Sequence, residues 1–466
     1  MLPDVYYARC EPRYSSVPLS PDAPIRGALR SLWRARGDDP DNPFGEYVAP
    51  GGSVVIKPNW VLDINRSGGG LDCLVTHPSV IQCVIEDCAK ALKGEGRIVV
   101  GDAPIQGCNF ASLMKSLGMK AVVESVRKEY PRLDIRIDDW RLTVIERKSV
   151  FHSEKRIEHH RQSFRDTSPA ILENYTEVDL EKESFLEEIS DYAERFRVTM
   201  YRPSLLLAHH RVGVHQYLVR KEVLDADLVV SLAKMKTHQK AGLTGAMKNL
   251  VGINGHKEYL PHHIKGSYAA GGDSYQQDNY FLSWAEDLYD RWWESESELG
   301  RWQRWSYEKR YMLLRVLARM TGARHISFGS WSGNETIWRT TLDLNHLLYF
   351  GQRRPKRIIN IVDGIIAGEG DGPLASSPKE TGLVLLGENP AYLDAVIARF
   401  MGYNVSRIPT VYHAVHHRKS KFGGVSLDDL PIYRVAGDGT KTQHNWRDIE
   451  TMRFGPPPRW ERAQAH

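Results

Sequence analysis

Short apolar runs that end in polar residues recur along the chain and predict buried strands. The first such runs lie at 53–56, 98–100 and 228–232. Between the first two, Pro78 opens a segment of helical period, and Thr76 or His77 can cap the helix. A strand, a helix and a second strand in this order are typical of a parallel sheet with crossover helices.

The later part of the chain carries further signals of the same kind. Apolar runs predict strands at 204–207, 357–362 and 382–386. Asn389 and Pro390 then start a helix that continues through Phe400 and ends at Gly402. Between the last two predicted strands, residues 364–372 include four glycines. We expect a flexible loop there that can close over a ligand, or else a tight turn.

Two stretches depart from this alternation and predict insertions. Residues 131–202 are polar and charged with little period, which indicates loops or short edge elements. Residues 267–345 have helical period and are rich in Trp and Arg, which predicts a helical pair packed by its aromatics. A substrate lid or a dimer contact is the alternative for that pair.

The predicted fold class is therefore α/β, with a mostly parallel sheet, crossover helices and two insertions, one polar and one Trp/Arg-rich and helical. The predicted division is an N-terminal lead-in at 1–48, an α/β core made of 49–130, 203–266 and 346–406, the polar insertion at 131–202, the helical insertion at 267–345 and a C-terminal tail at 407–466.

Composition and charge limit the class of partner. The 466 residues carry a net charge of +4 and no long Lys/Arg stripe, so the chain does not look like a nucleic-acid binder. No window approaches ~18 consecutive apolar residues, so we expect no membrane partner. The N-terminus lacks a secretory signal pattern, and the expected location is cytoplasmic. A homo-oligomer stays open.

The cysteines are few and carry no metal-binding spacing. There are five, at positions 10, 73, 83, 88 and 108, and no C-x-x-C pair. The usual spacing of a cysteine zinc site or of an iron–sulfur cluster is therefore absent. Reduced core thiols of a cytoplasmic protein explain the set.

Basic groups gather where one predicted strand ends. Lys234, Lys236 and His238 follow the apolar run at 228–232, and Lys248 and Asn249 follow a glycine-broken turn. Crowded lysines repel one another unless an anion lies among them. The segment therefore predicts a site for phosphate or carboxylate, and nearby carboxylates that pair with the lysines are the alternative. A Walker motif is absent.

Two further positions are candidate substrate contacts. Lys57 and Asn59 follow the first strand, whose carboxyl end lies at the same sheet edge as that of the 228–232 strand. An Asx-type turn at Asn59 is the alternative. Arg339 can contact the substrate as well, although an i, i+4 ion pair with Glu335 explains it equally.

Histidines and strand-end carboxylates suggest a divalent transition metal. The four candidate ligands are His77, His209, Asp102 and Asp363. The H-E-x-x-H motif is absent, and hydrogen-bonded histidines with helix-capping aspartates are the alternative.

Several sequence pieces, in a fixed order, resemble one protein family. They are VVIKPNW at 54–60, THPSV at 76–80, IVVGDAP at 98–104, KMKTH at 234–238, LTGAMKNLVGING at 243–255, SGNETIWRTTLDLNHLLY at 332–349, VDGIIAGEGDGP at 362–373 and NPAYLDAVIARFMGYN at 389–404. The chain resembles the domain-of-unknown-function-362 family in these pieces, whereas the two insertions and the tail lie outside the resemblance. The resemblance implies an α/β fold and a largely uncharacterised activity. Many relatives carry a ferredoxin-like cysteine cluster, which this chain lacks.

The leading hypothesis is an enzyme that acts on a small anionic substrate, phosphorylated or carboxylated, at the carboxyl ends of the parallel strands. Catalysis would be metal-assisted or would rely on lysine and histidine as acid and base. The candidate catalytic residues are His238, Lys236 and Lys248, and the candidate substrate contacts are Lys57, Asn59, Lys234, Asn249 and Arg339. One alternative is a redox or metallocentre protein served by a separate ferredoxin as electron donor. Another is a binding or scaffold protein that uses the helical insertion.

Overall fold

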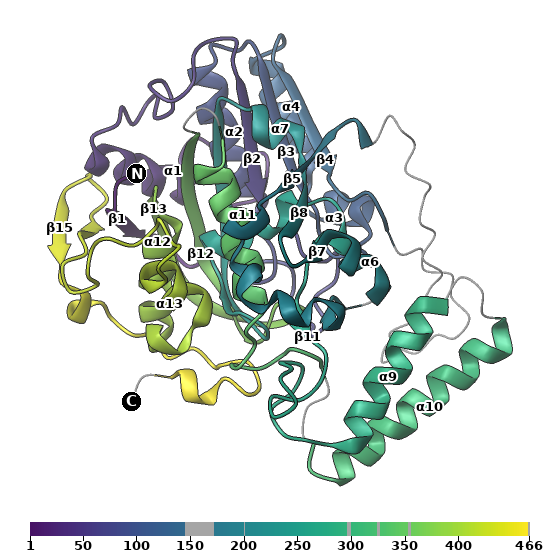
Figure 1. The fold of residues 1–466 in the computed structure, drawn as a ribbon. Helices are drawn as coiled ribbons and strands as arrows, with labels where there is room; N and C mark the ends of the chain where they lie inside the picture. The colour runs from purple at the N-terminus through teal and green to yellow at the C-terminus, as the bar shows by residue number, and fades with distance from the viewer. Residues whose placement is uncertain (145–171, 200, 296–299, 324–326, 353–355, 465–466) are drawn as a thin grey trace.

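The computed structural model describes residues 1–144, 172–199, 201–295, 300–323, 327–352 and 356–464 (Figure 1). Residues 145–171, which belong to the polar insertion expected from the sequence, lie outside the described residues.

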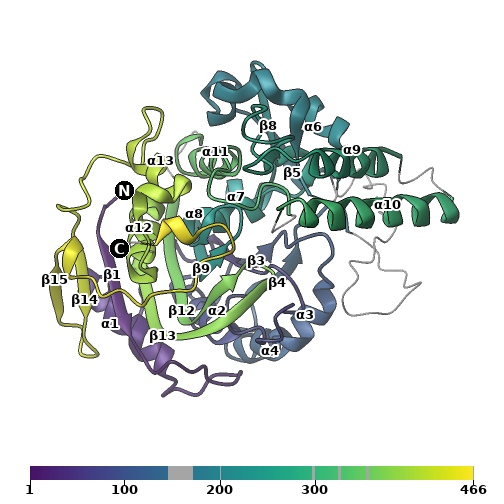
Figure 2. The ribbon, with the colours of Figure 1, turned by 90° about the horizontal axis from the view of Figure 1, so that it is seen from below.

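A ten-stranded sheet forms the centre of the protein (Figures 1 and 2). Its strands are β1 (Val5–Arg9), β2 (Ser53–Pro58), β3 (Arg97–Asp102), β4 (Asp134–Asp139), β9 (Leu228–His238), β10 (Gly242–Thr244), β12 (Arg357–Asp371), β13 (Ala375–Gly387), β14 (Ile432–Val435) and β15 (Lys441–His444). Their order is β15-β14-β1-β13-β12-β9-β2-β3-β4, and β10 pairs with β9 outside this path.

Apart from the short strand β10, the half of the sheet that carries the site is parallel. Neighbouring strands in the series β12-β9-β2-β3-β4 run in the same direction. The mostly parallel α/β fold expected from the sequence is therefore confirmed. From β2 the chain moves outward through β3 to β4, and it then returns to the opposite side of β2 for β9 and β12. The strand order thus reverses between β2 and β9, which is where open α/β sheets form ligand crevices.

Helices cover both faces of the sheet (Figure 2). One face carries α1 (Pro24–Arg36), α2 (Pro78–Ala91), α3 (Phe110–Ser116) and α4 (Met119–Glu129). The other carries α7 (Lys221–Asp225), α8 (Ala246–Asn249), η3 (Leu250–Ile253), α11 (Ile337–Phe350), α12 (Pro390–Met401) and α13 (Pro409–His416). The strand residues alternate between the two cores because successive side chains of a strand point to opposite faces.

Two predicted helix starts are confirmed at the level of hydrogen bonds. His77 caps α2, since its Nδ1 accepts a hydrogen bond from the backbone N–H of Ser79. Asn389 caps α12 in the same manner, and Gly402 ends that helix in the left-handed conformation.

Two strands extend further than their apolar runs indicated. β9 continues through His238, so Lys234, Lys236 and His238 lie within the strand rather than after it. The flexible loop expected at 364–372 is wrong, because these residues form most of the second half of β12 and pair with β13. Gly368 is needed there for close packing, because a Cβ on it would meet the carbonyl oxygen of Cys73 at 2.5 Å.

The strand predicted at 204–207 is wrong. These residues lie in helix α6 (Pro203–His209), where Pro203 occupies the first turn. Of the apolar run, Leu206 is buried and Leu207 is exposed, as suits a short surface helix. His209 therefore ends a helix outside the large sheet.

Segments expected outside the core also supply strands to the large sheet. The lead-in at 1–48 provides β1, the tail at 407–466 provides β14 and β15, and the polar stretch at 131–202 provides β4. Two small sheets lie beside the large one, made of β5 (Tyr175–Asp179), β8 (Val214–Arg220) and β7 (His210–Arg211), and of β11 (His263–Ile264) and β6 (Phe196–Arg197). Short 3-10 turns complete the described chain: η1 (Glu181–Glu183), η2 (Phe185–Arg195), η4 (Lys257–Tyr259), η5 (Val405–Arg407), η6 (Trp446–Asp448) and η7 (Glu461–Ala463).

A helical hairpin projects from the body of the molecule (Figures 1 and 2). It consists of α9 (Tyr280–Ser295) and α10 (Arg301–Met320), within the range expected to be a helical insertion. The two helices share a small core that includes Ala285, Tyr311 and Ala318. No helix in the described part of the chain is long and apolar enough to cross a membrane.

Candidate functional site

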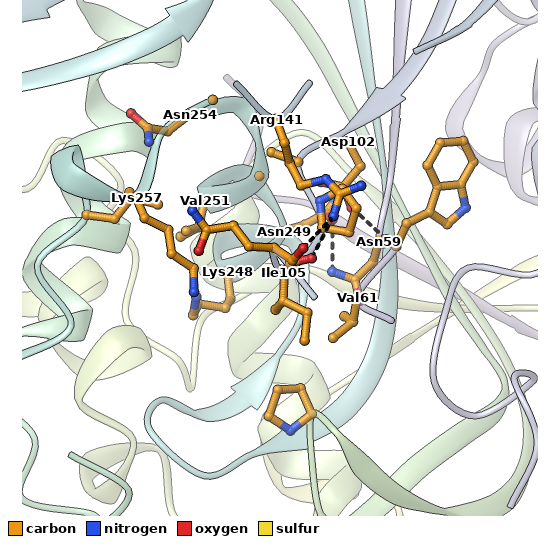
Figure 3. Close-up of a pocket in the computed structure, with 18 of the residues that line it drawn as sticks. Asn59, Val61, Asp102, Ile105, Arg141, Lys248, Asn249, Val251, Asn254 and Lys257 are labelled. Atoms are coloured by element: carbon orange, nitrogen blue, oxygen red, sulfur yellow. Dashed lines mark hydrogen bonds between the residues drawn. The ribbon is translucent and has the colours of Figure 1, made fainter. Parts of the chain in front are cut away.

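A small cavity lies at the carboxyl ends of β2, β3, β4 and β9, where the strand order reverses. Its volume is about 170 Å³, smaller than the pockets that hold drug-sized ligands, so only a very small ligand would fit in it. Its main polar lining is Asn59, Asp102, Arg141, His238, Lys248, Asn249, Asn254, His256, Lys257 and His262 (Figure 3). Five residues predicted for the site are among them: Asn59, Asp102, His238, Lys248 and Asn249.

An ion pair between two predicted site residues is buried next to the cavity. Lys57 Nζ lies 2.7 Å from Asp102 Oδ1, and both side chains are almost completely removed from solvent. The backbone N–H of Trp60 donates to the other carboxylate oxygen of Asp102 at 2.6 Å. Burial lowers the pKa of Lys57 and raises that of Asp102, while their mutual attraction opposes both shifts.

Asn249 links this ion pair to the cavity wall. Its Oδ1 accepts hydrogen bonds from Lys57 Nζ at 3.3 Å and from Asn59 Nδ2 at 3.4 Å. Its Nδ2 donates to the carbonyl of Lys57 at 2.9 Å. Asn59 Oδ1 is buried and has no hydrogen-bond partner among the described residues, which leaves an acceptor for a ligand.

A carboxylate on the neighbouring helix fixes the turn that carries Lys248. Asp394 of α12 accepts hydrogen bonds from the backbone N–H groups of Ala246 and Met247, at 2.6 and 3.1 Å. Burial raises the pKa of Asp394 to about 7. A Cβ on Gly245 would overlap Asp394, so glycine is required where this helix begins.

Lys248 is a cavity amine without a carboxylate partner among the described residues. It is half-buried, and no carboxylate in the described part of the chain forms an ion pair with it. Burial lowers its pKa to about 7, and repulsion from Lys240 and Lys57 adds to the effect. At neutral pH the amine therefore exists in both protonation states, as a general acid or base requires.

Two histidines beside Lys248 are held as opposite tautomers. His238 Nδ1 accepts hydrogen bonds from the backbone N–H groups of Lys240 and Ala241, at 3.1 and 3.2 Å, which places the proton on Nε2. His262 Nδ1 donates to the carbonyl of Leu260 at 2.6 Å, which leaves its Nε2 as an acceptor. Burial and the charge of Lys248 keep the pKa of both histidines well below the ordinary value.

Lys257 and Arg141 are the remaining lysine and arginine among the described lining residues of the cavity. Burial lowers the pKa of Lys257 to about 7, and its Nζ donates to the carbonyl of Thr199 at 3.0 Å. Arg141 pairs with Asp139 and also donates to three backbone carbonyls, so its side chain is held in place. Asp102 is the single carboxylate among the described lining residues, and Lys57 neutralises it.

A second buried group joins other predicted site residues away from the cavity. Lys234 Nζ lies 3.1 Å from Asp363 Oδ2 and donates to Tyr14 Oη at 2.6 Å, and Tyr14 donates to Asp363 Oδ1 at 2.5 Å. The ring of His77 stacks on Tyr14 with centroids 3.8 Å apart. Burial lowers the pKa of His77 to about 3, so this imidazole is neutral. Lys236 lies nearby, and its Nζ donates to the carbonyl of Leu74.

Two predicted residues lie elsewhere and have other partners. Arg339 of α11 pairs with Glu335 at 3.1 Å and Glu188 at 3.5 Å and does not line the cavity. His209 stacks on Tyr259 with centroids 3.7 Å apart, next to the small sheet made of β5, β8 and β7.

The four residues predicted to hold a metal are not brought together. Asp102 is paired with Lys57, and Asp363 is paired with Lys234. His77 lies beside Asp363 but caps α2 with its Nδ1, and His209 lies with Tyr259. Within the described ranges no group of three His, Cys, Asp or Glu side chains could hold a metal ion. The divalent metal stays a prediction.

The structure adds residues that the sequence pattern did not single out. Lys257 and His262 line the cavity, and Tyr14 completes the second buried group. His262 stands beside His263 in the stretch after Lys248, and this pair of histidines is a weak sequence signal for a site. Tyr14 lies in the lead-in, more than 200 positions before Lys234, and no local pattern marks it.

Comparisons with known proteins find one family. A family model described as "Domain of unknown function (DUF362)" matches residues 54–157 and 203–399. The second range runs through the helical hairpin, which the motif resemblance had left out. A comparison with curated proteins finds no match.

One solved structure is similar at a distance. It is a crystal structure of a protein from Thermotoga maritima, determined as a structural genomics target, with 9% sequence identity and a TM-score of 0.35. The match covers 82% of this chain and 58% of the Thermotoga chain, so this protein spans little more than half the length of that relative.

Proposed function

Because the chain belongs to the DUF362 family, whose description names no activity, we propose from its geometry that it is an enzyme that acts on a small anionic substrate with Lys248 as acid and base. The observation that carries the proposal is Lys248 itself. It is an amine without a carboxylate partner in the described residues, beside two neutral histidines in a cavity at the topological switch point of the sheet.

An anion is the expected ligand because the cavity has more cationic side chains than carboxylates among the described lining residues. Lys248 and Lys257 face it without a carboxylate partner among the described residues, and the one lining carboxylate is neutralised by Lys57. Desolvation has pushed both lysines toward their neutral forms. A phosphate or carboxylate would reverse that shift, since an opposite charge nearby favours the charged amine. Ligand binding and protonation are therefore coupled.

The two histidines supply complementary hydrogen bonds to the same substrate. His238 offers an Nε2–H, which can stabilise negative charge that develops on a substrate oxygen. His262 offers an Nε2 lone pair, which can accept a hydrogen bond from a substrate hydroxyl or from the ammonium of Lys248. His238, expected as acid and base, thus serves better as a hydrogen-bond donor, and the proton moves to and from Lys248.

The turn that carries Lys248 is held in position by Lys57, Asp102 and Asn249. Asn249 holds the end of the turn after Lys248, and its own amide is fixed by Lys57 and Asn59. The predicted catalytic role of Lys236 has less support, because its amine is bonded to the carbonyl of Leu74 and does not line the cavity.

A ligand screen with a matched pair of variants tests the proposal. Small phosphorylated and carboxylated compounds are screened by thermal shift against the wild type, Lys248→Met and Lys120→Met. Lys120 is exposed on α4 and serves as the control. A compound that stabilises the wild type and the control but not Lys248→Met supports the assignment. Equal stabilisation of all three proteins contradicts it, as does the lack of any response across both compound classes.

A further inference from the structure

The helix α10 carries an apolar stripe that no described part of the chain covers. The stripe residues are Trp302, Trp305, Met312, Leu313, Val316 and Met320, exposed to 80%, 51%, 39%, 57%, 50% and 78%. At about 100° of rotation per residue, these six positions fall within an arc of roughly 100° and so lie on one face of the helix. Tyr311 and Ala318, which pack on α9, are buried on the opposite face. The stripe is therefore a second apolar face, distinct from the one that folds the hairpin.

Basic residues border the stripe. Lys309, Arg310 and Arg319 lie in or beside the stripe, whereas Arg315 packs over the ring of Tyr311 on the opposite face. The helix has a single acid, Glu308. Lys309 lies over the ring of Trp305, 6.0 Å from its centroid. In the described part of the chain no carboxylate forms an ion pair with Lys309, Arg310 or Arg319. A helix of this kind, with aromatic and aliphatic residues on one face and cations beside them, is typical of segments that lie in a lipid interface.

The stripe lies on the side of α10 that faces away from α9. Acids of the other helix bind the body: Asp290 of α9 pairs with Arg197 at 3.0 Å and Lys265 at 2.6 Å. Glu294 accepts a hydrogen bond from the backbone N–H of Ser204 at 2.7 Å. The acids thus hold α9 to the body, while α10 forms the outer edge of the molecule (Figures 1 and 2). A helix of 20 residues is about 30 Å long, enough for an extended contact.

We propose that α10 binds an anionic lipid surface, with Trp302 and Trp305 entering the interface and the flanking lysine and arginines contacting lipid phosphates. The positive charge of α10 favours an anionic lipid surface over a second copy of the helix. Two copies of α10 facing each other would bring Lys309 and its neighbours against like charges, which opposes a dimer through this face. A lipid surface offers both an apolar layer for the stripe and negative charge for the cations. The expectation of no membrane partner rested on the lack of a spanning segment, whereas this helix would lie in the plane of the interface.

Vesicle co-sedimentation of the full chain tests the proposal. The protein is mixed with vesicles of phosphatidylcholine alone and of phosphatidylcholine with phosphatidylglycerol. We expect sedimentation with the mixed vesicles and little with the neutral ones, and we expect added salt to weaken it. Trp302→Ala with Trp305→Ala should weaken partitioning at least about ten-fold. Arg319→Gln should weaken it roughly five-fold, as for one charge at an anionic surface.

Control variants separate the helix face from general effects. Val212→Ser changes an apolar residue that is 61% exposed outside the hairpin and should leave sedimentation unchanged. Unchanged sedimentation of the double tryptophan variant, or equal binding to neutral and anionic vesicles, overturns the proposal. So does a concentration-dependent dimer, seen by analytical ultracentrifugation without lipid, that Leu313→Glu abolishes, because the face would then be a contact between two copies. Failure of this test leaves the proposed function of the cavity unaffected, since α10 contributes no residue to it.

Discussion

Lys57 Nζ and Asp102 Oδ1 lie 2.7 Å apart, with 1% and 4% of their side chains exposed. The pair joins the ends of two adjacent parallel strands directly next to the cavity. A charge buried at this depth is tolerated because its partner compensates it, and the lone charge that remains after one partner is removed is strongly unfavourable.

Asp102→Asn should therefore destabilise the protein by about 3–5 kcal/mol. Urea unfolding followed by circular dichroism measures the change. The matched variant is Lys57→Met with Asp102→Leu, which removes both charges and should cost clearly less than the single change. A single variant as stable as the wild type would contradict the view that Lys57 is charged in the folded protein.

Lys248 should react as an amine whose pKa is about 7. Acylation by a small reagent requires the neutral amine, so the labelling rate at Lys248 should level off above about pH 8. The labelling rate of an ordinary lysine, with a pKa of about 10.4, would continue to rise through that range. Peptide mass spectrometry after brief labelling gives the rate at each lysine, and a Lys248 profile that keeps rising beyond pH 9 would count against the shift.

The lowered pKa of Lys248 makes the stability of the protein depend on pH. Folded Lys248 loses its proton above pH 7, whereas the unfolded chain keeps that proton to about pH 10.4. The unfolded state thus binds more protons between these values, so the Lys248 contribution becomes more favourable as the pH rises. Between pH 6 and pH 10 the stability of the wild type should therefore rise relative to that of Lys248→Met, by up to about 4 kcal/mol. Thermal unfolding at several pH values tests this, and a constant difference would contradict it.

Gly252 should tolerate no side chain. A Cβ at this position would overlap Asp102 Oδ1 and meet Lys57 Nζ at 2.9 Å. Gly252→Ala must therefore displace the buried pair, and we expect a loss of about 2–4 kcal/mol together with the loss of anion binding. Gly107→Ala is the control, since nothing lies within 4 Å of a Cβ built there. Equal stability of the two variants in urea unfolding would show that the pair can move aside.

Arg339 should matter for stability and not for the ligand. Its guanidinium pairs with Glu335 and Glu188 and lies 4.0 Å over the ring of Trp338. Arg339→Met should cost about 1–2 kcal/mol of stability and leave the affinity for a cavity ligand unchanged. Isothermal titration with a compound from the thermal-shift screen measures that affinity. If Arg339→Met instead lowered the affinity for the ligand and left the stability unchanged, Arg339 would again be a candidate substrate contact.

The sequence by itself determined the parallel half of the sheet and part of the site. Apolar runs located β2, β3, β12 and β13, and the caps His77 and Asn389 located two helices, because these signals depend on residues close together in the chain. Polar residues after those runs led to Asn59, Lys248 and Asn249, since parallel strands bring their carboxyl ends to one edge.

Tertiary structure alone decided which of the predicted cations remain available. Lys57 and Lys234 look alike beside Lys248 in the sequence, but their partners, Asp102 and Asp363, lie on other strands and neutralise them. Distant pairing also extended β9 past Lys234 and turned the glycine-rich run at 364–372 into a strand, because β13 and close backbone packing supply what local propensity lacks. Lys248 keeps an available amine because no described carboxylate comes close enough to form an ion pair with it. That depends on the positions of all its neighbours in the folded protein.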